Sequence, residues 1–186
     1  MDILGDNLMT EPVLLGLSGA LRADSTNRKL LREAARLFGP CSFAEADLRL
    51  PLYDGDDEAK QGVPDVVQAL AAQIAGADAI VVSTPEYNKG PSGVLKNALD
   101  WVSRTDGNPW QDKPVAVMSA AAGRAGGERA QMVLRGFMVP FQPRLLQGPE
   151  LHLADTSNQF DGAGRLTGEM YVKTLAALMQ KLRVMI

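Results

Sequence analysis

Short apolar runs alternate with longer amphipathic segments along this chain of 186 residues. Three of the runs, residues 13–17, 78–82 and 114–118, have the largely apolar character of strands that are buried on both faces. Residues 42–48 alternate loosely, as in a more exposed strand, and residues 150–153 predict a last strand. Five strands that alternate with helices predict an α/β fold in which a parallel sheet has helices on both faces.

Amphipathic periodicity predicts the helices that lie between the strands. The apolar residues of segment 63–74 recur at i, i+3, i+4, i+7, i+8 and i+11, which places them on one face of a helix. Similar patterns predict helices over residues 27–38, 92–103, 124–138 and 171–182. The polar, turn-rich segment 50–62 is expected to be a loop, and residues 1–10 a loose leader. Because no linker interrupts this order, the sequence predicts a single domain over residues 1–186.

The composition argues against several classes of function. A net charge of −3 gives no electrostatic reason to bind nucleic acid, and no basic segment would hold the chain on anionic lipid. No apolar stretch reaches the roughly 20 residues of a membrane span and no signal peptide is recognisable, so we expect no membrane contact and a cytoplasmic location. Cys41 and His152 are the only cysteine and histidine, which leaves no ligand set for a zinc site of the usual kind.

The loop between the first predicted strand and the first predicted helix has the features of a phosphate-binding site. Its polar side chains are Ser18, Arg22, Ser25, Thr26 and Asn27, and it leads into a helix N-terminus whose free N–H groups favour an anion. Arg22 would add a charge-assisted hydrogen bond. The alternative is a simple capped helix, with Ser25 as the N-cap and Arg22 in solvent. The loop is longer and more polar than capping requires, which favours the ligand.

Other phosphate-binding and hydrolytic motifs are missing from the sequence. It contains neither G-x-x-x-x-G-K-[ST] nor G-x-G-x-x-G, which argues against a P-loop NTPase and a dinucleotide-binding Rossmann site. A cysteine phosphatase would need its nucleophile in the first loop, but Cys41 lies beyond that loop. Residues 16–20 come near the G-x-S-x-G elbow, yet His152 precedes Asp155, which is the wrong order for an α/β-hydrolase triad.

The segment after the second buried strand carries the most specific motif. It reads P-E-Y-N-K-G-P-S-G-V-L-K-N-A-L-D-W over residues 85–101. This resembles the P-E-Y-N…G-x-L-K-N-A-[IL]-D-W signature of the NADPH-dependent FMN reductases, which are flavodoxin-like quinone, ferric, chromate and azo reductases. Residues 18–27 resemble the phosphate motif of that family, S-G-S-L-R-x-x-S-x-N, and residues 119–127 resemble its glycine-rich loop. The chain departs from the family with Ala20 in place of serine and with residues 89–92 in place of G-S-x-P.

The resemblance implies a flavodoxin-like three-layer sandwich with a five-stranded parallel sheet in the order 2-1-3-4-5. It also implies FMN as the cofactor, NADPH or NADH as the electron donor, and a homodimer or homotetramer. The residues that would hold the FMN phosphate are Ser18, Arg22, Ser25, Thr26 and Asn27. Those that would border the isoalloxazine ring on one side are Pro85, Glu86, Tyr87 and Asn88, and those that would close the other side are Ser119, Gly123 and Arg124.

Two functions from different classes fit these motifs. A reductase would pass hydride from NAD(P)H through FMN to a quinone, ferric chelate, chromate, azo compound or flavin, with no catalytic side chain of its own. A flavodoxin-like electron carrier would never meet a nicotinamide, and such carriers are strongly acidic and shield the ring with aromatic side chains. This chain is mildly acidic and its third loop offers alanine and glycine, so we expect one open ring face and a reductase. A scaffold protein that has lost the flavin is disfavoured because Arg22 and Tyr87 are both present.

Overall fold

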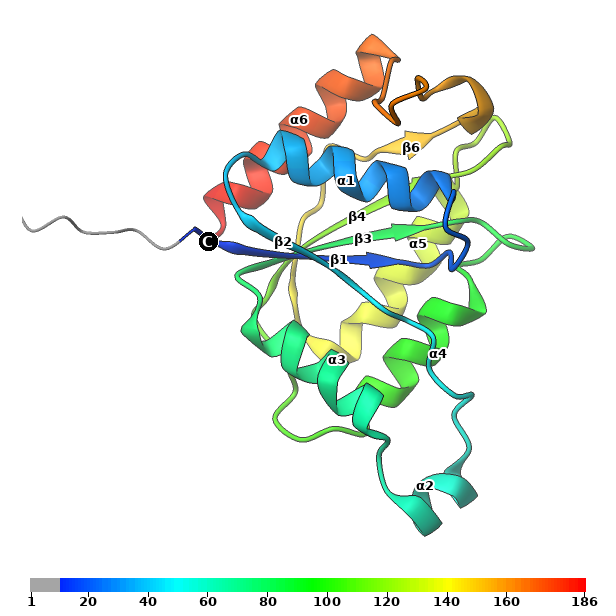
Figure 1. Cartoon of the computed structure of the whole chain (residues 1–186), viewed down its shortest axis with the longest axis vertical. Helices are drawn as coiled ribbons and strands as arrows, with labels where there is room; N and C mark the ends of the chain where they lie inside the picture. Colours follow the sequence, from blue (N-terminus) through cyan, green and yellow to red (C-terminus); the bar gives the residue numbers. More distant parts are fainter. Residues whose placement is uncertain (1–10) are drawn as a thin grey trace, which may run out of the picture.

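The computed structural model describes residues 11–186, and the predicted leader at residues 1–10 lies outside that range. Its centre is a parallel sheet with the strand order β2-β1-β3-β4-β5, which confirms the fold class expected from the sequence. Figure 1 shows β2, β1, β3 and β4 side by side. A further strand, β6, also pairs with β4 in parallel. The strands are β1 (Val13–Ser18), β2 (Ser42–Ala46), β3 (Ala79–Thr84), β4 (Pro114–Ala120), β5 (Arg144–Leu145) and β6 (His152–Leu153).

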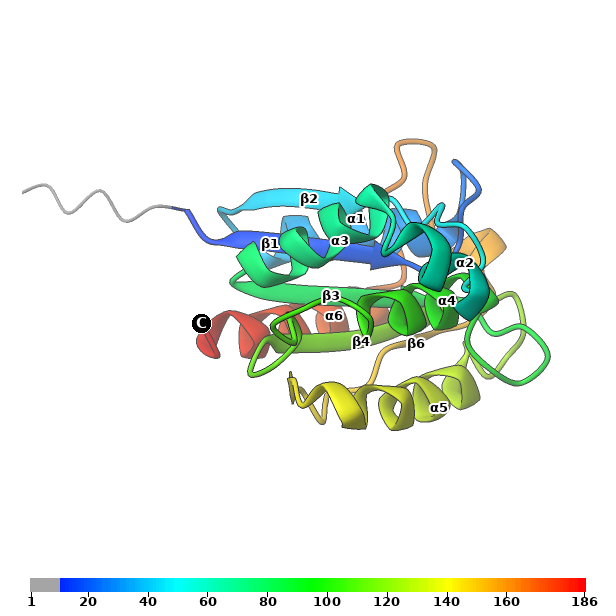
Figure 2. The same ribbon diagram turned by 90° about the horizontal axis from the view of Figure 1, so that it is seen from below.

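Helices cover both faces of the sheet. The first face carries α1 (Thr26–Phe38) and α6 (Glu169–Val184), and the second carries α3 (Asp65–Gly76), α4 (Gly93–Val102) and α5 (Glu128–Met138), which Figure 2 shows in that order across the sheet. Side chains of a strand alternate between the two faces. In β1, Leu14 therefore joins the apolar cluster under α1 and α6, whereas Leu15 and Leu17 join the cluster under the other three helices.

The last part of the sheet differs from the prediction. The sequence predicted one strand at residues 150–153, but two strands of two residues each share this position beside β4. β5 pairs with the first residues of β4, and β6 pairs with its last residues. Pro149 lies between them and has no N–H to donate, so a continuous strand would lose a hydrogen bond there.

The segment predicted to be a loop at residues 50–62 contains a short helix, α2 (Gly55–Gln61). Asp54 caps it, because its Oδ1 accepts a hydrogen bond of 2.8 Å from the Asp56 N–H. No residue of α2 is buried, so it has no apolar face that periodicity could have indicated.

The helix predicted over residues 124–138 begins later, at Glu128. Gly126 and Gly127 precede it with φ angles of +60° and +93°, which lie outside the helical region. The segment between β4 and α5 is consequently a longer loop, residues 121–127, than the sequence suggested.

A buried carboxylate in α1 anchors the segment that leads from β6 to α6. Glu33 is 2% exposed and accepts hydrogen bonds from Arg36 Nη2 (2.9 Å), Arg165 Nη1 (3.1 Å) and the Leu166 N–H (3.3 Å). Burial raises the pKa of Glu33, but the hydrogen bonds from the two arginines and from Leu166 together lower it more, so this pKa lies below its ordinary value. The ionised carboxylate is therefore the form that stabilises the fold.

The lowered pKa of Glu33 predicts that part of the stability depends on pH. The contribution of the carboxylate is complete above the unfolded-state pKa of about 4.3 and is lost as pH falls through the lower folded-state pKa. Glu33→Gln is expected to be about 1 kcal/mol less stable at neutral pH, since both arginines are partly exposed, and this difference should shrink in acid. Urea denaturation across pH measures it, with the exposed Glu169→Gln as control. A difference that stays constant into acid would contradict the assignment.

Candidate functional site

A cavity of about 520 Å³ opens at the carboxyl ends of β1, β3 and β4. Ligands of parallel α/β sheets bind at this edge, and the volume lies within the roughly 300–1,000 Å³ of ligand pockets. The loops after these three strands form its walls, together with one residue of the 3-10 helix η2 (Thr156–Asn158). The lining residues are Ala20, Leu21, Arg22, Ser25, Thr26, Asn27, Pro85, Glu86, Tyr87, Ala120, Ala121, Ala122, Gly123, Ala125, Gly126, Gly127 and Thr156.

Most of the residues predicted to form the site line this cavity. They are Arg22, Ser25, Thr26, Asn27, Pro85, Glu86, Tyr87 and Gly123. The remaining predicted residues, Ser18, Asn88, Ser119 and Arg124, do not line it. Ser18 and Ser119 are buried at the ends of strands, whereas Asn88 and Arg124 are exposed on loops.

The N-terminal end of α1 forms one end of the cavity and offers free hydrogen-bond donors. Ser25 is the N-cap, and its Oγ accepts from the Asn27 N–H at 3.2 Å. Within residues 11–186, no acceptor pairs with the backbone N–H groups of Thr26, Arg28 or residues 21–24. The exposed guanidinium of Arg22 has no ion-pair partner in the same part of the chain. The N-cap hydrogen bond of Ser25 therefore leaves free donors at this end of the cavity, an arrangement that suits a phosphate group.

Two serines that were predicted to contact the cofactor form hydrogen bonds with the loops that follow their own strands. The Ser18 hydroxyl accepts from the Ala20 N–H at 3.2 Å and donates to the Ala20 carbonyl at 3.1 Å. The Ser119 hydroxyl donates to the Gly126 carbonyl at 2.6 Å and accepts from Gln131 Nε2 at 2.8 Å. Both hydroxyls are thus buried and bonded within the protein, and the predicted contacts of these two residues with the cofactor stay predictions.

Pro85 and Tyr87 belong to the wall that the loop after β3 contributes. Pro85 is buried and Tyr87 is 58% exposed. The backbones of Tyr87 and Gly90 bond in both directions, at 2.9 and 3.1 Å, and so close a tight turn. Asn88 and Lys89 form its tip with φ angles of +50° and +70°, a region that asparagine tolerates better than most residues. Asn88 therefore serves the turn, and its predicted place beside the ring stays a prediction.

Glu86 connects the loops after β3 and β4. Its Oε2 accepts hydrogen bonds from the backbone N–H groups of Arg129 and Ala130, at 3.1 and 3.2 Å. The N-cap residue of α5, Gly127, has no side chain with which to bind these groups. Glu86 thus caps α5 from another loop, at the end of the helix where a negative charge is favourable. It also lines the cavity, so one residue fixes the distance between two of its walls.

Two glycines bring the loop 121–127 close to the strands below it. A Cβ on Gly126 would overlap the carbonyl of His152, and a Cβ on Gly127 would lie 2.7 Å from Ser119 Cβ. The sequence placed the alanines and glycines of residues 119–127 beside the ring as a loop, without naming Gly126 or Gly127, and Thr156 is a further lining residue. A glycine pair after a strand was the available signal for the first two, whereas nothing in the sequence pointed to Thr156. His152 lies in β6, where its backbone pairs with Ser119 of β4.

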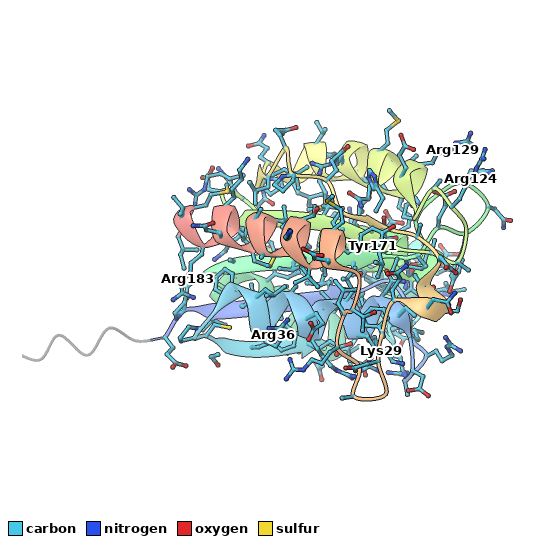
Figure 3. The ribbon with its side chains drawn as sticks, turned by 90° about the horizontal axis from the view of Figure 1, so that it is seen from above. Lys29, Arg36, Arg124, Arg129, Tyr171 and Arg183 are labelled. Atoms are coloured by element: carbon cyan, nitrogen blue, oxygen red, sulfur yellow. The ribbon has the colours of Figure 1, made fainter. Side chains whose placement is uncertain are left out.

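Arg124 and Arg129 project from the same corner of the molecule, where the loop after β4 meets α5 (Figure 3). Both are exposed, and neither has an ion-pair partner among the residues that the structure describes. Arg124 stands between Gly123 and Ala125, which do line the cavity. This corner therefore presents two guanidinium groups without ion pairs within the described chain, next to the carboxylate of Glu86.

Two other kinds of site are missing from residues 11–186. No three of their histidine, cysteine, aspartate and glutamate side chains are grouped so as to hold a metal ion. None of the helices in this part of the chain is both long enough and apolar enough to cross a membrane.

Known proteins resemble this chain in sequence and in structure. The family model of the NADPH-dependent FMN reductases matches residues 12–156. An NAD(P)H-dependent FMN reductase of Pseudomonas aeruginosa is 40% identical over 173 residues, which cover 92% of this chain and 93% of that protein. A 2-hydroxy-1,4-benzoquinone reductase of a Burkholderia species is 38% identical over 166 residues, which cover 88% and 90%.

Among solved structures, FerB of Paracoccus denitrificans, a flavoenzyme NAD(P)H:(acceptor) oxidoreductase, superimposes with a TM-score of 0.83. It is 30% identical, and the match covers 93% of this chain and 96% of FerB. The similarity thus extends over nearly the whole of both chains. This chain belongs to the family of NADPH-dependent FMN reductases.

Proposed function

We propose that this protein is an FMN-dependent NAD(P)H oxidoreductase that reduces quinones. Membership of the family implies FMN and a nicotinamide donor, and the Burkholderia relative is named for a quinone substrate. The observation that carries the proposal is the cavity with two different ends. Free N–H groups and Arg22 stand at one end, and a wall of Pro85, Tyr87 and small residues stands at the other. A flat, partly apolar cofactor with a phosphate tail is complementary to both.

The phosphate of FMN is assigned to the N-terminal end of α1. The unpaired backbone N–H groups of residues 21–24 and Thr26 would bind its oxygens, and the Arg22 guanidinium would add a charge-assisted bond. Ser25 accepts a hydrogen bond from the chain with its lone pair, which leaves its hydroxyl proton to donate.

The ring of FMN is assigned to the space between the loop after β3 and the loop after β4. Pro85 and Tyr87 supply apolar surface on the first side. On the second side, the backbone N–H groups of residues 122–125 have no acceptor within the described chain and can donate to the polar edge of the ring. Glu86 holds the two sides at a fixed separation through its bonds to α5.

Bound FMN would supply the redox chemistry, by accepting hydride from a nicotinamide and delivering electrons to the acceptor. The task of the protein is to orient the ring and to leave one face accessible. Tyr87 is the only aromatic residue among the described lining residues, and the opposite loop contributes alanine and glycine. An electron carrier would cover both faces, so these small residues favour the reductase.

An anaerobic titration of the FMN-loaded protein with NADH and with NADPH tests this function. The flavin absorbance is expected to bleach with at least one nucleotide and to recover when a benzoquinone is added. If FMN binds but neither nucleotide bleaches it, the protein is an electron carrier. If FMN does not bind, the assignment of the cavity is wrong. The same experiment measures the preference between NADH and NADPH, in which the unpaired Arg124 could take part as a partner for a 2′-phosphate.

Several finer expectations stay predictions. Ferric chelates, chromate, azo compounds and free flavin are further acceptors, and each is tested by whether it restores the absorbance of the reduced protein. The homodimer or homotetramer implied by the resemblance is tested by light scattering. The cytoplasmic location is tested by fractionation of the source cells.

A further inference from the structure

Asn27, in the first turn of α1, connects three segments that are far apart in the sequence. Its Nδ2 donates to the Ala120 carbonyl at 3.0 Å, while its Oδ1 accepts from the Ala120 N–H at 3.1 Å and from the Ser83 hydroxyl at 2.9 Å. The contact with Ala120 runs in both directions, as between paired strands. It fixes the orientation of the amide, because a reversed amide would place donor against donor.

These bonds leave little of the amide for a ligand. A primary amide makes about four hydrogen bonds, and three are made here within the protein. Asn27 is also only 2% exposed, although it lines the cavity. The family motif implied a contact between this side chain and the phosphate, but the side chain is instead committed to the ends of two strands.

The bonded positions lie at the base of the walls that would hold the ring. Ala120 is the last residue of β4 and immediately precedes the loop 121–127. Ser83 lies in β3, two residues before Pro85. Asn27 itself is fixed in the helix that presents the phosphate donors. Its side chain therefore sets where the ring walls stand relative to the phosphate end of the cavity.

We infer that Asn27 is a positioning residue for the flavin ring and that its side chain is not a phosphate ligand. This inference rests on the proposed function and adds that Asn27 positions the ring walls, whereas Arg22 binds the phosphate. Riboflavin differs from FMN only by lacking the phosphate, so it separates the two roles. Loss of a phosphate ligand lowers the affinity for FMN and leaves that for riboflavin unchanged, whereas loss of a positioning residue lowers the affinity for riboflavin as well.

The test compares the affinities of Asn27→Ala and Arg22→Ala for FMN and riboflavin, measured by fluorescence quenching well below each unfolding temperature. Asn27→Ala is expected to lower the affinity for riboflavin about tenfold or more, and that for FMN at least as much. Arg22→Ala is expected to lower the affinity for FMN alone. An Asn27→Ala variant that loses FMN affinity but keeps riboflavin affinity would show a phosphate ligand and overturn the inference. Unchanged affinity for both flavins would overturn it too.

Ser83→Ala provides a milder variant that removes only one of the three bonds. Ser83 does not line the cavity, and the bond to Asn27 is the one hydrogen bond that its hydroxyl makes among residues 11–186. Its substitution is expected to lower riboflavin affinity a few-fold and to have no further effect when added to Asn27→Ala. If the two substitutions lowered riboflavin affinity additively in the double variant, Ser83 would not act through Asn27. If the unsubstituted protein bound neither flavin, the proposed function would fail and this inference with it, whereas a failure confined to the variants refutes the inference alone.

Discussion

Replacing Gly126 by alanine is expected to cost about 2–5 kcal/mol of folding stability and to displace the loop that closes the cavity. Gly126 has a φ of +60°, in the left-handed region where a residue with a side chain is disfavoured. The added Cβ would also overlap the carbonyl of His152. That carbonyl cannot retreat easily, because His152 is paired with Ser119 in the sheet. Two independent causes thus act at one residue.

Gly123→Ala in the same loop is the matched control. Gly123 has no left-handed φ, and nothing lies within 4 Å of the Cβ that alanine would add. Urea denaturation should give this variant the free energy of unfolding of the unsubstituted protein, and equal stabilities of the two variants would contradict the argument. Because Gly123 lines the cavity, a bulkier side chain there is expected to preserve stability and yet slow the reduction of bound flavin by a nicotinamide.

The central strands were predictable because strands that are buried on both faces consist largely of apolar residues. β1, β3 and β4 are covered on both faces, so their sequences are nearly continuous apolar runs. β5 and β6 have two residues each, which is too short for any period to show. α2 has no buried residue, and a local cap determines where it begins. Prediction thus succeeded where packing dictates residue type and failed for elements that are too short or too exposed for packing to determine their sequence.

The loops of the site were predictable because they follow the buried strands, but the roles of their polar residues were not. Asn27, Glu86 and Ser119 all read in sequence as possible ligands. The partners that determine their roles are distant, since Asn27 and Ala120 are 93 residues apart and Glu86 and Arg129 are 43 apart. A side chain that binds a cofactor and one that holds a loop have the same polar groups. Only the fold shows which of these groups already have hydrogen-bond partners within the protein.

Arg22 is the charged residue among those predicted to bind the phosphate, and it lines the cavity without an ion-pair partner within residues 11–186. Arg22→Ala is expected to weaken FMN binding by about 1.5–3 kcal/mol, a rise in Kd of roughly 10- to 150-fold. The side chain is exposed and has no ion-pair partner within residues 11–186, so folding stability should change by less than about 0.5 kcal/mol. Arg22→Lys keeps the positive charge but lacks the planar guanidinium. Its FMN affinity should lie between that of the unsubstituted protein and that of Arg22→Ala.

Arg32→Ala separates a direct contact from a general effect of charge. Arg32 is also exposed on α1, and its loss removes the same positive charge, but it does not line the cavity. A direct bond from Arg22 to the phosphate predicts that Arg32→Ala keeps the FMN affinity of the unsubstituted protein. If long-range attraction alone mattered, both variants would weaken binding alike, and the weakening would disappear at high salt. An unchanged Kd in Arg22→Ala would mean that the phosphate does not lie at this end of α1.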